Sequence, residues 1–315
     1  MFQPTSIAAA SLLVAAIAFP ASAQDTVRFG AGQQGSQNYG VNSALAQAVE
    51  ERTDLSVQVQ SFGGPTAYLP LLDAGELDFA AVVMPDAGDA VRGQGPFEGA
   101  ELGNLSLVAP LFHAPVGLMV RAGEAIETIS DLEGKRVAWG MPAQASLMPY
   151  VLGSLANGGL GEDDVTPVPV ASVANGVDAL VAGEVDAALF ALRSGKVVQA
   201  DSAAGGIRWL PYDDSEEAVA AMQEIAPEAY LVPVRPEDEV VGAPDPMMTM
   251  AYDYVLLANA AVDDETVSTV ARMLQTKGAE IAESNRVIGA ITAASLRRDY
   301  PAFTRHPGAA AVLGD

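Results

Sequence analysis

The chain has 315 residues, no cysteine and a formal net charge of −24, from 40 acidic against 16 basic side chains. This charge excludes a nucleic-acid-binding protein, which needs basic patches, and the lack of cysteine excludes disulfides, thiolate metal sites, a cysteine nucleophile and a lipid anchor at a signal junction. Hydrophobic residues make up 50% of the chain, and its length suggests two domains of ordinary size.

The N-terminal residues predict an export signal. Residues 7–19 form an apolar, alanine-rich run that is too short to span a bilayer. The small-x-small triplet Ala21-Ser22-Ala23 follows, so we expect residues 1–23 to be removed as a signal peptide and the mature chain to begin near Gln24. Residues 1–6 contain no lysine or arginine, so either the α-amino group supplies the positive end or the start lies upstream. An alanine-rich tail is the alternative interpretation. We expect a soluble protein of the periplasm.

The first part of the mature chain alternates strands and helices. Residues 27–30 predict a short strand that enters a glycine-rich loop over 31–36, and a helix with apolar residues at helical spacing follows. A second helix is predicted to end at Gly75, which can adopt positive φ, and an apolar strand follows over 79–83.

The later part of the chain continues this alternation. The apolar strand at 113–120 is expected to cross from one lobe to the other. A strand at 137–140 then enters a loop over 141–146, and a helix ending at Gly183 leads into a strand over 187–192. A strand at 252–257 is expected to carry the chain back, and an Asp-rich cap at Asp263 predicts the start of a helix.

These two stretches repeat one another. The strand, loop and helix around Gly30 match those around Gly140, and the Gly-Glu-x-Asp turn at Gly75 matches that at Gly183, in the same order and at nearly the same spacing. Each repeat reads β-loop-α-β-α-β, which favours a parallel sheet with helices on its faces. We therefore predict an α/β chain with a duplicated lobe: lobe 1 over 24–116, lobe 2 over 117–250, and a return strand with C-terminal helices over 251–315 that pack on lobe 1.

The ordered motifs resemble the TAXI family, the solute receptors of one branch of tripartite ATP-independent periplasmic (TRAP) transporters. The similarity covers essentially all of the mature chain. The sequence departs from the family pattern in the first loop, where Gln33, Gln34, Gln37 and Asn38 replace small residues, and in the loop at 191–195. The matching segments are 30–39, 71–82, 115–121, 132–137 and His306-Pro307-Gly308-Ala309.

This resemblance implies the type II periplasmic binding protein fold, in which two lobes with mostly parallel sheets are joined by crossing hinge strands around a ligand cleft. It implies capture of a small organic solute, often a glutamate-like amino acid or a dicarboxylate, and delivery to a TRAP membrane permease subunit. We expect a monomer that is not an enzyme, with no cofactor, no metal, no catalytic residues and no nucleic-acid partner.

The ligand is expected beyond the carboxyl ends of the strands, where loops enter helices. Helix N-termini present unpaired N–H groups and partial positive charge, so two facing lobes could bind an anion without a basic side chain. A tight packing turn is the alternative interpretation of the glycine-rich loop. A nucleotide phosphate loop is disfavoured, because no Lys-Ser/Thr follows the glycines.

Several residue types in these loops can hydrogen-bond a solute. Arg193 follows a buried strand, where its guanidinium could pair with a carboxylate; the alternative is a surface arginine near Lys196. Ser36 could instead only cap its helix, and Tyr252 could belong to the core. The residues predicted to contact ligand are Gln33, Gln34, Ser36, Asn38, Tyr39, Gly64, Pro65, Thr66, Met84, Pro85, His113, Gln144, Ala145, Ser146, Ser172, Arg193, Thr249 and Tyr252.

Two other functions remain open. The receptor of an ATP-driven (ABC) importer for a sulfonate or related anion shares the fold, and a neighbouring gene for a multi-span permease or for an ATPase would separate the two. A periplasmic enzyme on the same bilobal fold is the alternative of another class. The two histidines, His113 and His306, belong to no apparent Ser-His-Asp set, and two cannot make a metal cluster.

Overall fold

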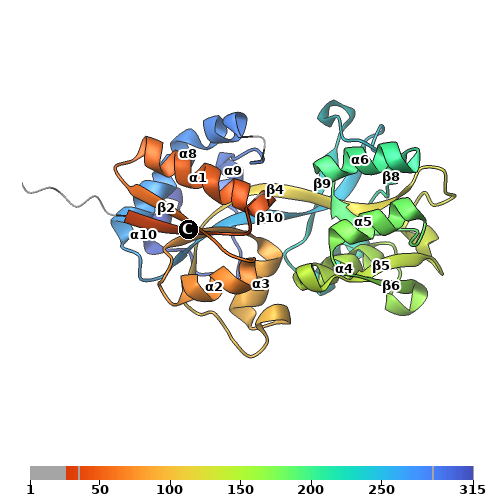
Figure 1. Cartoon of the computed structure of the whole chain (residues 1–315), viewed down its shortest axis with the longest axis horizontal. Helices are drawn as coiled ribbons and strands as arrows, with labels where there is room; N and C mark the ends of the chain where they lie inside the picture. Colours follow the sequence, from red (N-terminus) through yellow and green to blue (C-terminus); the bar gives the residue numbers. More distant parts are fainter. Residues whose placement is uncertain (1–25, 35, 286, 315) are drawn as a thin grey trace, which may run out of the picture.

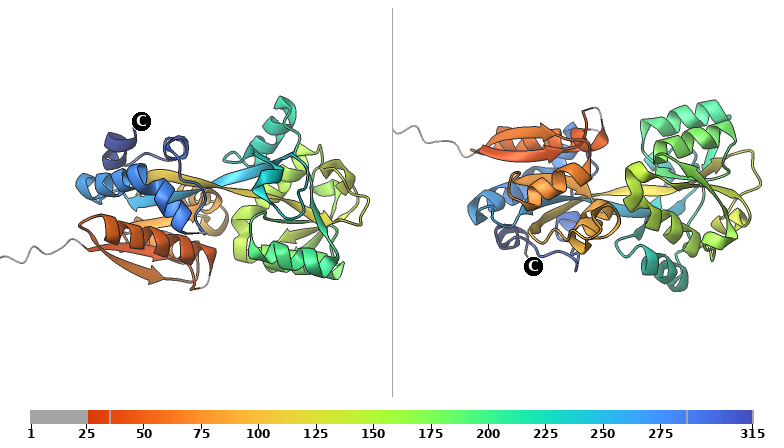
Figure 2. Two further views of the ribbon diagram at one scale, coloured as in Figure 1. Left: turned by 90° about the horizontal axis from the view of Figure 1, so that it is seen from above. Right: turned by 60° about the horizontal axis from the view of Figure 1, so that its bottom comes forward.

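The computed structural model describes residues 26–34, 36–285 and 287–314, so the predicted signal peptide lies outside the described residues. Two bodies lie side by side and are joined by two long strands, β4 (Leu105–Arg121) and β10 (Met247–Asn259) (Figure 1). Two further directions of view show the same separation (Figure 2). The predicted bilobal α/β architecture is therefore present.

Lobe 1 is built on the first repeat. Strand β1 pairs in parallel with both β2 and β3, as the alternation of strands and helices predicted. The C-terminal helices lie in the same lobe (Figure 1). The elements are β1 (Thr26–Ala31), α1 (Gln37–Arg52), β2 (Ser56–Ser61), α2 (Pro65–Asp73), β3 (Phe79–Val83), α3 (Met84–Arg92), the 3-10 turn η1 (Gly95–Phe97), α8 (Asp264–Ser284), α9 (Ala293–Leu296) and α10 (Pro307–Leu313).

Lobe 2 is built on the second repeat. Strand β5 pairs in parallel with β6, and Val137 forms a parallel bridge with Ala187. The elements are η2 (Ile129–Leu132), β5 (Arg136–Gly140), η3 (Pro142–Leu147), α4 (Met148–Asn157), η4 (Glu162–Asp164), β6 (Thr166–Val170), α5 (Val173–Ala182), β7 (Ala188–Ala191), α6 (Gly195–Ala204), β8 (Ile207–Trp209), α7 (Glu216–Ile225), β9 (Tyr230–Val234) and η5 (Pro236–Asp238).

The two hinge strands run through both lobes. Strand β10 pairs antiparallel with β3 in lobe 1 and with β9 in lobe 2, and β4 lies along its other edge. The sheet order is β2-β1-β3-β10-β4-β7. The strands predicted at 113–120 and 252–257 are therefore parts of longer strands, because each serves as an inner strand of both lobes.

Each lobe buries an apolar core on both faces of its sheet. In lobe 1 one core joins Phe29 and Leu256 to α1 and α8, and another joins Leu257 to α2 and α3. In lobe 2 the corresponding cores lie against α4 and α7, and against α5 and α6. None of the helices in the described part of the chain combines the length and the apolar character that a bilayer span needs.

The internal repeat extends to individual hydrogen bonds. The main chain and guanidinium of Arg28 donate to the carboxylate of Asp78, at 2.7 to 2.9 Å, and Arg136 and Asp186 form the same arrangement. Gly75 and Gly183, the predicted helix ends, both have φ of +75°.

The strand register corrects one detail of the predicted repeat. Phe29 lies opposite Phe79 and Val137 opposite Ala187, so Phe29 corresponds to Val137. Gly140 then corresponds to Gly32 and not to Gly30. The loop of lobe 2 is longer, because the chain forms the 3-10 turn η3 before α4 begins.

Candidate ligand-binding cleft

The first loop of lobe 1 uses much of its hydrogen-bonding capacity within the protein. Ser36 caps α1, and its Oγ accepts from the main-chain N–H of Tyr39. Asn38 Oδ1 accepts from Gly32, and its Nδ2 donates to Tyr68 Oη and to the carbonyl of Ala81. Ser36 and Asn38 therefore shape the loop, in line with the capping alternative for Ser36.

The remaining predicted residues of lobe 1 divide by exposure. Gln33, Gln34 and Thr66 are exposed, and Tyr39, Gly64 and Pro65 are half-buried. Pro85 is buried but lines a pocket between the lobes. Met84 points into the core beside Tyr68 and Phe97 and is fully buried, so its prediction as a contact is corrected: the first residue after β3 packs under the sheet.

In lobe 2 the predicted loop residues lie at the starts of α4 and α5. Gln144 Oε1 accepts from the main-chain N–H of Val173, which ties η3 to α5. Ser172 caps α5 through its Oγ. Ala145 is half-buried, and Ser146 has an exposed fraction of only 3%.

Two of the three predicted hinge residues are buried, and the third is exposed. Thr249 is fully buried and its Oγ1 donates to the carbonyl of Val116, so it braces the two hinge strands and does not face the cleft. Tyr252 is buried and packs edge-on against Tyr150, with ring centroids 5.2 Å apart. His113 is exposed on β4, so it stays a predicted contact.

Arg193 follows the surface alternative. Its guanidinium forms an ion pair with Asp238 at 3.1 Å, and its side chain is 60% exposed. This pairing joins the loop after β7 to η5. It favours the surface alternative, and a contact of Arg193 with a carboxylate of the solute stays a prediction.

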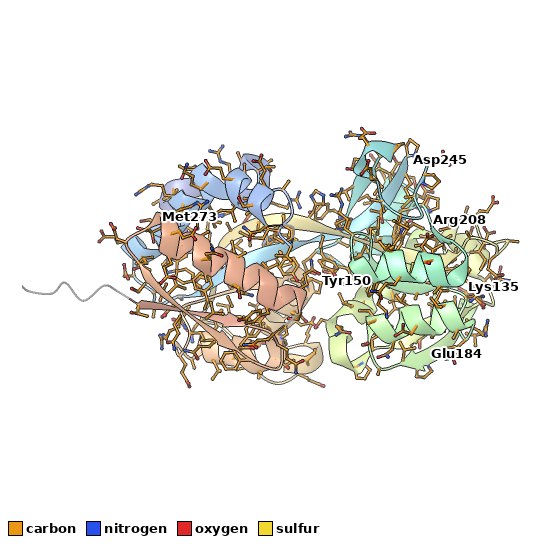
Figure 3. The ribbon with its side chains drawn as sticks, turned by 45° about the horizontal axis from the view of Figure 1, so that its top comes forward. Lys135, Tyr150, Glu184, Arg208, Asp245 and Met273 are labelled. Atoms are coloured by element: carbon orange, nitrogen blue, oxygen red, sulfur yellow. The ribbon has the colours of Figure 1, made fainter. Side chains whose placement is uncertain are left out.

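A pocket of about 310 Å³ opens between the lobes, and sequence reasoning missed most of its wall. Lobe 1 supplies α3 and the turn after it, and lobe 2 supplies η3, the start of α4 and the segment between α7 and β9. Figure 3 shows Tyr150 on the side of lobe 2 that faces lobe 1. The lining residues are Pro85, Asp89, Arg92, Gln94, Ser146, Pro149, Tyr150, Glu224, Ile225, Ala226, Pro227 and Glu228.

Two hydroxyl groups in this pocket have no hydrogen-bond partner among the described residues. They are Ser146 Oγ and Tyr150 Oη, both on residues with exposed fractions of 3% or less. Buried polar groups are almost always hydrogen-bonded, so these two hydroxyls indicate a place where a bound molecule completes the network.

An ion pair joins the lobes along one side of the pocket. The guanidinium of Arg92 on α3 contacts the carboxylate of Glu228 before β9, and it lies 3.8 Å from Asp89. These three side chains are mostly buried. Arg92 is therefore already matched by acidic partners of the protein.

Asp86 is half-buried in the first turn of α3, one helical turn before Asp89 of the pocket wall, and is not itself a lining residue. The pKa of its carboxyl is raised to about 6, chiefly because the group is removed from water; the Ser146 hydroxyl lowers this pKa and the neighbouring Asp89 raises it. Ser146 Oγ approaches Asp86 and Asp89 but forms no hydrogen bond of acceptable geometry to either. In the described part of the chain Asp86 has no ion-pair partner. In the sequence, Asp86 is indistinguishable from an acidic residue that simply favours a helix start.

A second pocket, of about 590 Å³, lies wholly within lobe 2. It is lined by the end of α4, η2 and the start of α7, including Asn157, Tyr212 and Ser215. Asn157 and Tyr212 are already hydrogen-bonded within the protein. Because closure of the lobes would not change this pocket, the interlobe pocket is the better candidate.

The comparisons with known proteins agree with the fold. The sequence model of the NMT1-like family matches residues 29–314. A search of curated proteins finds no match.

Solved structures of binding proteins are similar to the chain. The periplasmic aliphatic sulphonate binding protein SsuA from Escherichia coli has 17% identity and a TM-score of 0.52 over 84% of this chain and 80% of its own. A TctC solute binding protein from Polaromonas has 14% identity and a TM-score of 0.54 over 85% and 90%. PhnD1 from Prochlorococcus marinus, solved with methylphosphonate, has 9% identity and a TM-score of 0.53 over 85% and 91%. These likenesses confirm the bilobal periplasmic binding protein fold.

Proposed function

Because the chain belongs to the NMT1-like family, we propose that it is a periplasmic solute-binding protein that captures a small organic solute between its lobes. Binding, and not chemical turnover, is the proposed activity. A ligand that touches both lobes stabilises the closed arrangement by its differential contacts, which is the basis of hinge closure.

The observation that carries this proposal is the interlobe pocket with its two unpartnered hydroxyls. Ser146 and Tyr150 come from lobe 2, and Pro85 and Asp89 come from lobe 1, so one small molecule can contact both. A pocket of about 310 Å³ has the size of a small metabolite.

Thermal-shift and calorimetric measurements on the mature chain test the proposal. We expect one class among amino acids, dicarboxylates and sulfonates to raise the melting temperature and to bind at a stoichiometry of one. A ligand at 100 times its Kd stabilises a protein by about 2.7 kcal/mol, which such a screen detects. Stabilisation by uncharged sugars alone would contradict a charged ligand, and turnover of any added compound would favour an enzyme.

For the transport partner we propose a TRAP membrane permease subunit, in the manner of the TAXI receptors, with a glutamate-like amino acid or dicarboxylate as solute. The ordered motifs at 30–39, 71–82, 115–121 and 132–137 support this assignment. Uptake of the solute by cells that carry the permease should require this chain and an ion gradient. Size-exclusion chromatography is expected to give a monomer, with and without solute.

A second candidate is the receptor of an ABC importer for a sulfonate. The fold likeness to the sulphonate-binding SsuA favours it. Uptake that depends on ATP hydrolysis, together with tight binding of alkanesulfonates, would select this candidate over the first.

A further inference from the structure

The chemistry of the interlobe pocket points to one feature of the solute, and this inference rests on the proposed binding function. Asp86 and Asp89 lie three residues apart on α3, so their side chains share one face of the helix. Both carboxyls are held against lobe 2, where Ser146 Oγ approaches them.

The charges around the pocket do not balance. The pocket wall carries three carboxyl groups, those of Asp89, Glu224 and Glu228, against the single guanidinium of Arg92. Arg92 is already paired with Glu228, so it is not free to neutralise Asp86. The pocket thus has an excess of negative charge; Glu224 is exposed to solvent, whereas Asp89 is buried, and an unneutralised charge at such a position is costly unless a cation binds.

The aromatic surroundings of Asp86 suit the same kind of group. Burial raises the pKa of Tyr68, Tyr252 and Tyr254, and the nearby Asp86 carboxyl raises it further, so the three phenols stay protonated. Tyr150 belongs to the pocket wall, and a tyrosine ring is a favourable neighbour for an organic cation. The unpartnered hydroxyls of Ser146 and Tyr150 can also accept hydrogen bonds from an N–H group.

We propose that the solute carries a protonated amino group, which binds between the carboxylates of Asp86 and Asp89 with Ser146 Oγ as an additional acceptor. The rest of the solute then extends toward the helix starts of the two lobes, where main-chain N–H groups favour an anionic end. A metal ion is a poorer fit, because no group of three or more histidine or acidic residues in the described ranges could hold one.

Matched pairs of probes that differ in the amino group test this proposal by calorimetry at pH 7.5. The pairs are L-glutamate and glutarate, taurine and ethanesulfonate, and 1,4-diaminobutane and 1,4-butanediol. We expect the amino member of at least one pair to bind roughly 30-fold or more tightly than its partner, the usual scale for a buried charge pair.

Variants locate the effect in the pocket. Asp86→Asn should abolish most of the preference for the amino member, and Ser146→Ala should reduce it several-fold. The matched control is Asp163→Asn, which removes the same charge at an exposed position of lobe 2 and should leave the preference unchanged.

The outcomes separate the two proposals. Equal or tighter binding of glutarate or ethanesulfonate would overturn the amino-group proposal and leave solute binding intact. Selective binding of 1,4-diaminobutane alone would support the amino group and contradict an anionic solute. If no member of any pair binds, both proposals fail. A preference that survives in Asp86→Asn would place the amino group elsewhere and would overturn the assignment.

Discussion

A carboxylate that is partly removed from water without a cation beside it costs free energy, and Asp86, half-buried in the first turn of α3, is such a residue. Removal from water raises the pKa of its carboxyl from 3.8 to about 6. At pH 7 the carboxyl is still mostly ionised, and this charge destabilises the folded state. We expect Asp86→Asn to increase the free energy of unfolding of the unliganded protein at pH 7 by about 1 to 3 kcal/mol, since the amide has nearly the same shape. Urea denaturation followed by circular dichroism measures this change. A destabilised variant would mean that the carboxylate has a partner in the folded protein.

The pH dependence of this difference is a second expectation. The folded pKa lies above the unfolded one, so the folded state binds the proton more tightly, and the penalty is present above pH 6 and shrinks as the pH falls toward 4. The gap in stability between Asp86→Asn and the wild type should therefore narrow between pH 7 and pH 4. If the difference in unfolding free energy stays constant over this pH range, its cause is a change in packing and not the charge of Asp86. The titratable and charged groups near Asp86 and the interlobe pocket are Asp89, Arg92, Glu224, Glu228, Tyr68, Tyr150, Tyr252 and Tyr254.

At the scale of elements, the hinge strand β10 is held by one fully buried carboxylate. Asp253 accepts two hydrogen bonds from Arg298 Nη1 at 2.9 Å, one from Tyr300 Oη at 2.9 Å and one from Tyr230 Oη. The guanidinium of Arg298 also lies 4.0 Å from the centre of the Tyr230 ring. The network therefore ties β10 to β9 in lobe 2 and to the C-terminal segment in lobe 1.

Removing this charge should weaken the hinge. Loss of one member of a buried charge pair costs about 3 to 5 kcal/mol, and the partial exposure of Arg298 reduces that figure, so we expect Asp253→Asn to destabilise the protein by about 2 to 4 kcal/mol. Chemical denaturation at pH 7 provides the measurement. The control Asp54→Asn, at an exposed position, should stay within about 0.5 kcal/mol of the wild type.

The packing of α10 on α8 explains the motif His306-Pro307-Gly308-Ala309. His306 Nδ1 accepts from the main-chain N–H of Gly308, and Pro307 occupies the first turn of the helix. A Cβ on Gly308 would lie 2.3 Å from the carbonyl oxygen of Asp264, which belongs to the backbone and cannot turn away.

The glycine is therefore required by a close approach of two helices. Gly308→Ala should force α10 away from α8 and destabilise the protein by about 1 to 3 kcal/mol. Gly103→Ala is the matched control, because a Cβ there meets nothing within 4 Å. Equal stability of the two variants would show that α10 contributes little to lobe 1.

Features that depend on residues close together in the sequence were predicted correctly, whereas features that depend on residues far apart in the sequence were not. Strands and helix ends follow from local patterns such as the apolar run at 79–83 and the glycines at 75 and 183, and these predictions are confirmed. Met84 and Thr249 differ because burial is set by neighbours far along the chain. Asp86 was missed for the same reason: its surroundings include Ser146 of η3, which is 60 residues away in sequence.

Arg193 shows that the ion-pair partner of a charged residue is not predictable from local sequence. Its position after a buried strand is correct, but its partner Asp238 is 45 residues away, and no local pattern indicates that pairing. The ligand loops could be located from the sequence, whereas the groups that would select the ligand depend on contacts between the lobes.

At the scale of the whole molecule, the ion pair between Arg92 and Glu228 bears on the balance between open and closed lobes. It joins α3 of lobe 1 to the segment before β9 of lobe 2, at the rim of the interlobe pocket. Because both partners belong to the protein, the ion pair is expected to lower the free-energy cost of closure independently of the solute. The apparent Kd of a receptor equals the Kd of its closed state divided by the fraction of molecules that are closed before binding. A larger closed fraction therefore gives a lower apparent Kd.

Glu228→Gln should therefore shift the unliganded protein toward the open arrangement. A partly buried charged hydrogen bond is worth about 1.5 to 3 kcal/mol, so we expect a larger radius of gyration in small-angle X-ray scattering and an affinity for solute lower by roughly 10-fold. Saturating solute should restore the compact form, because ligand contacts supply the missing free energy. Glu217→Gln, an exposed change at the start of α7, should alter neither quantity. If Glu228→Gln keeps the wild-type radius and affinity, the ion pair merely accompanies closure and the solute alone must drive it.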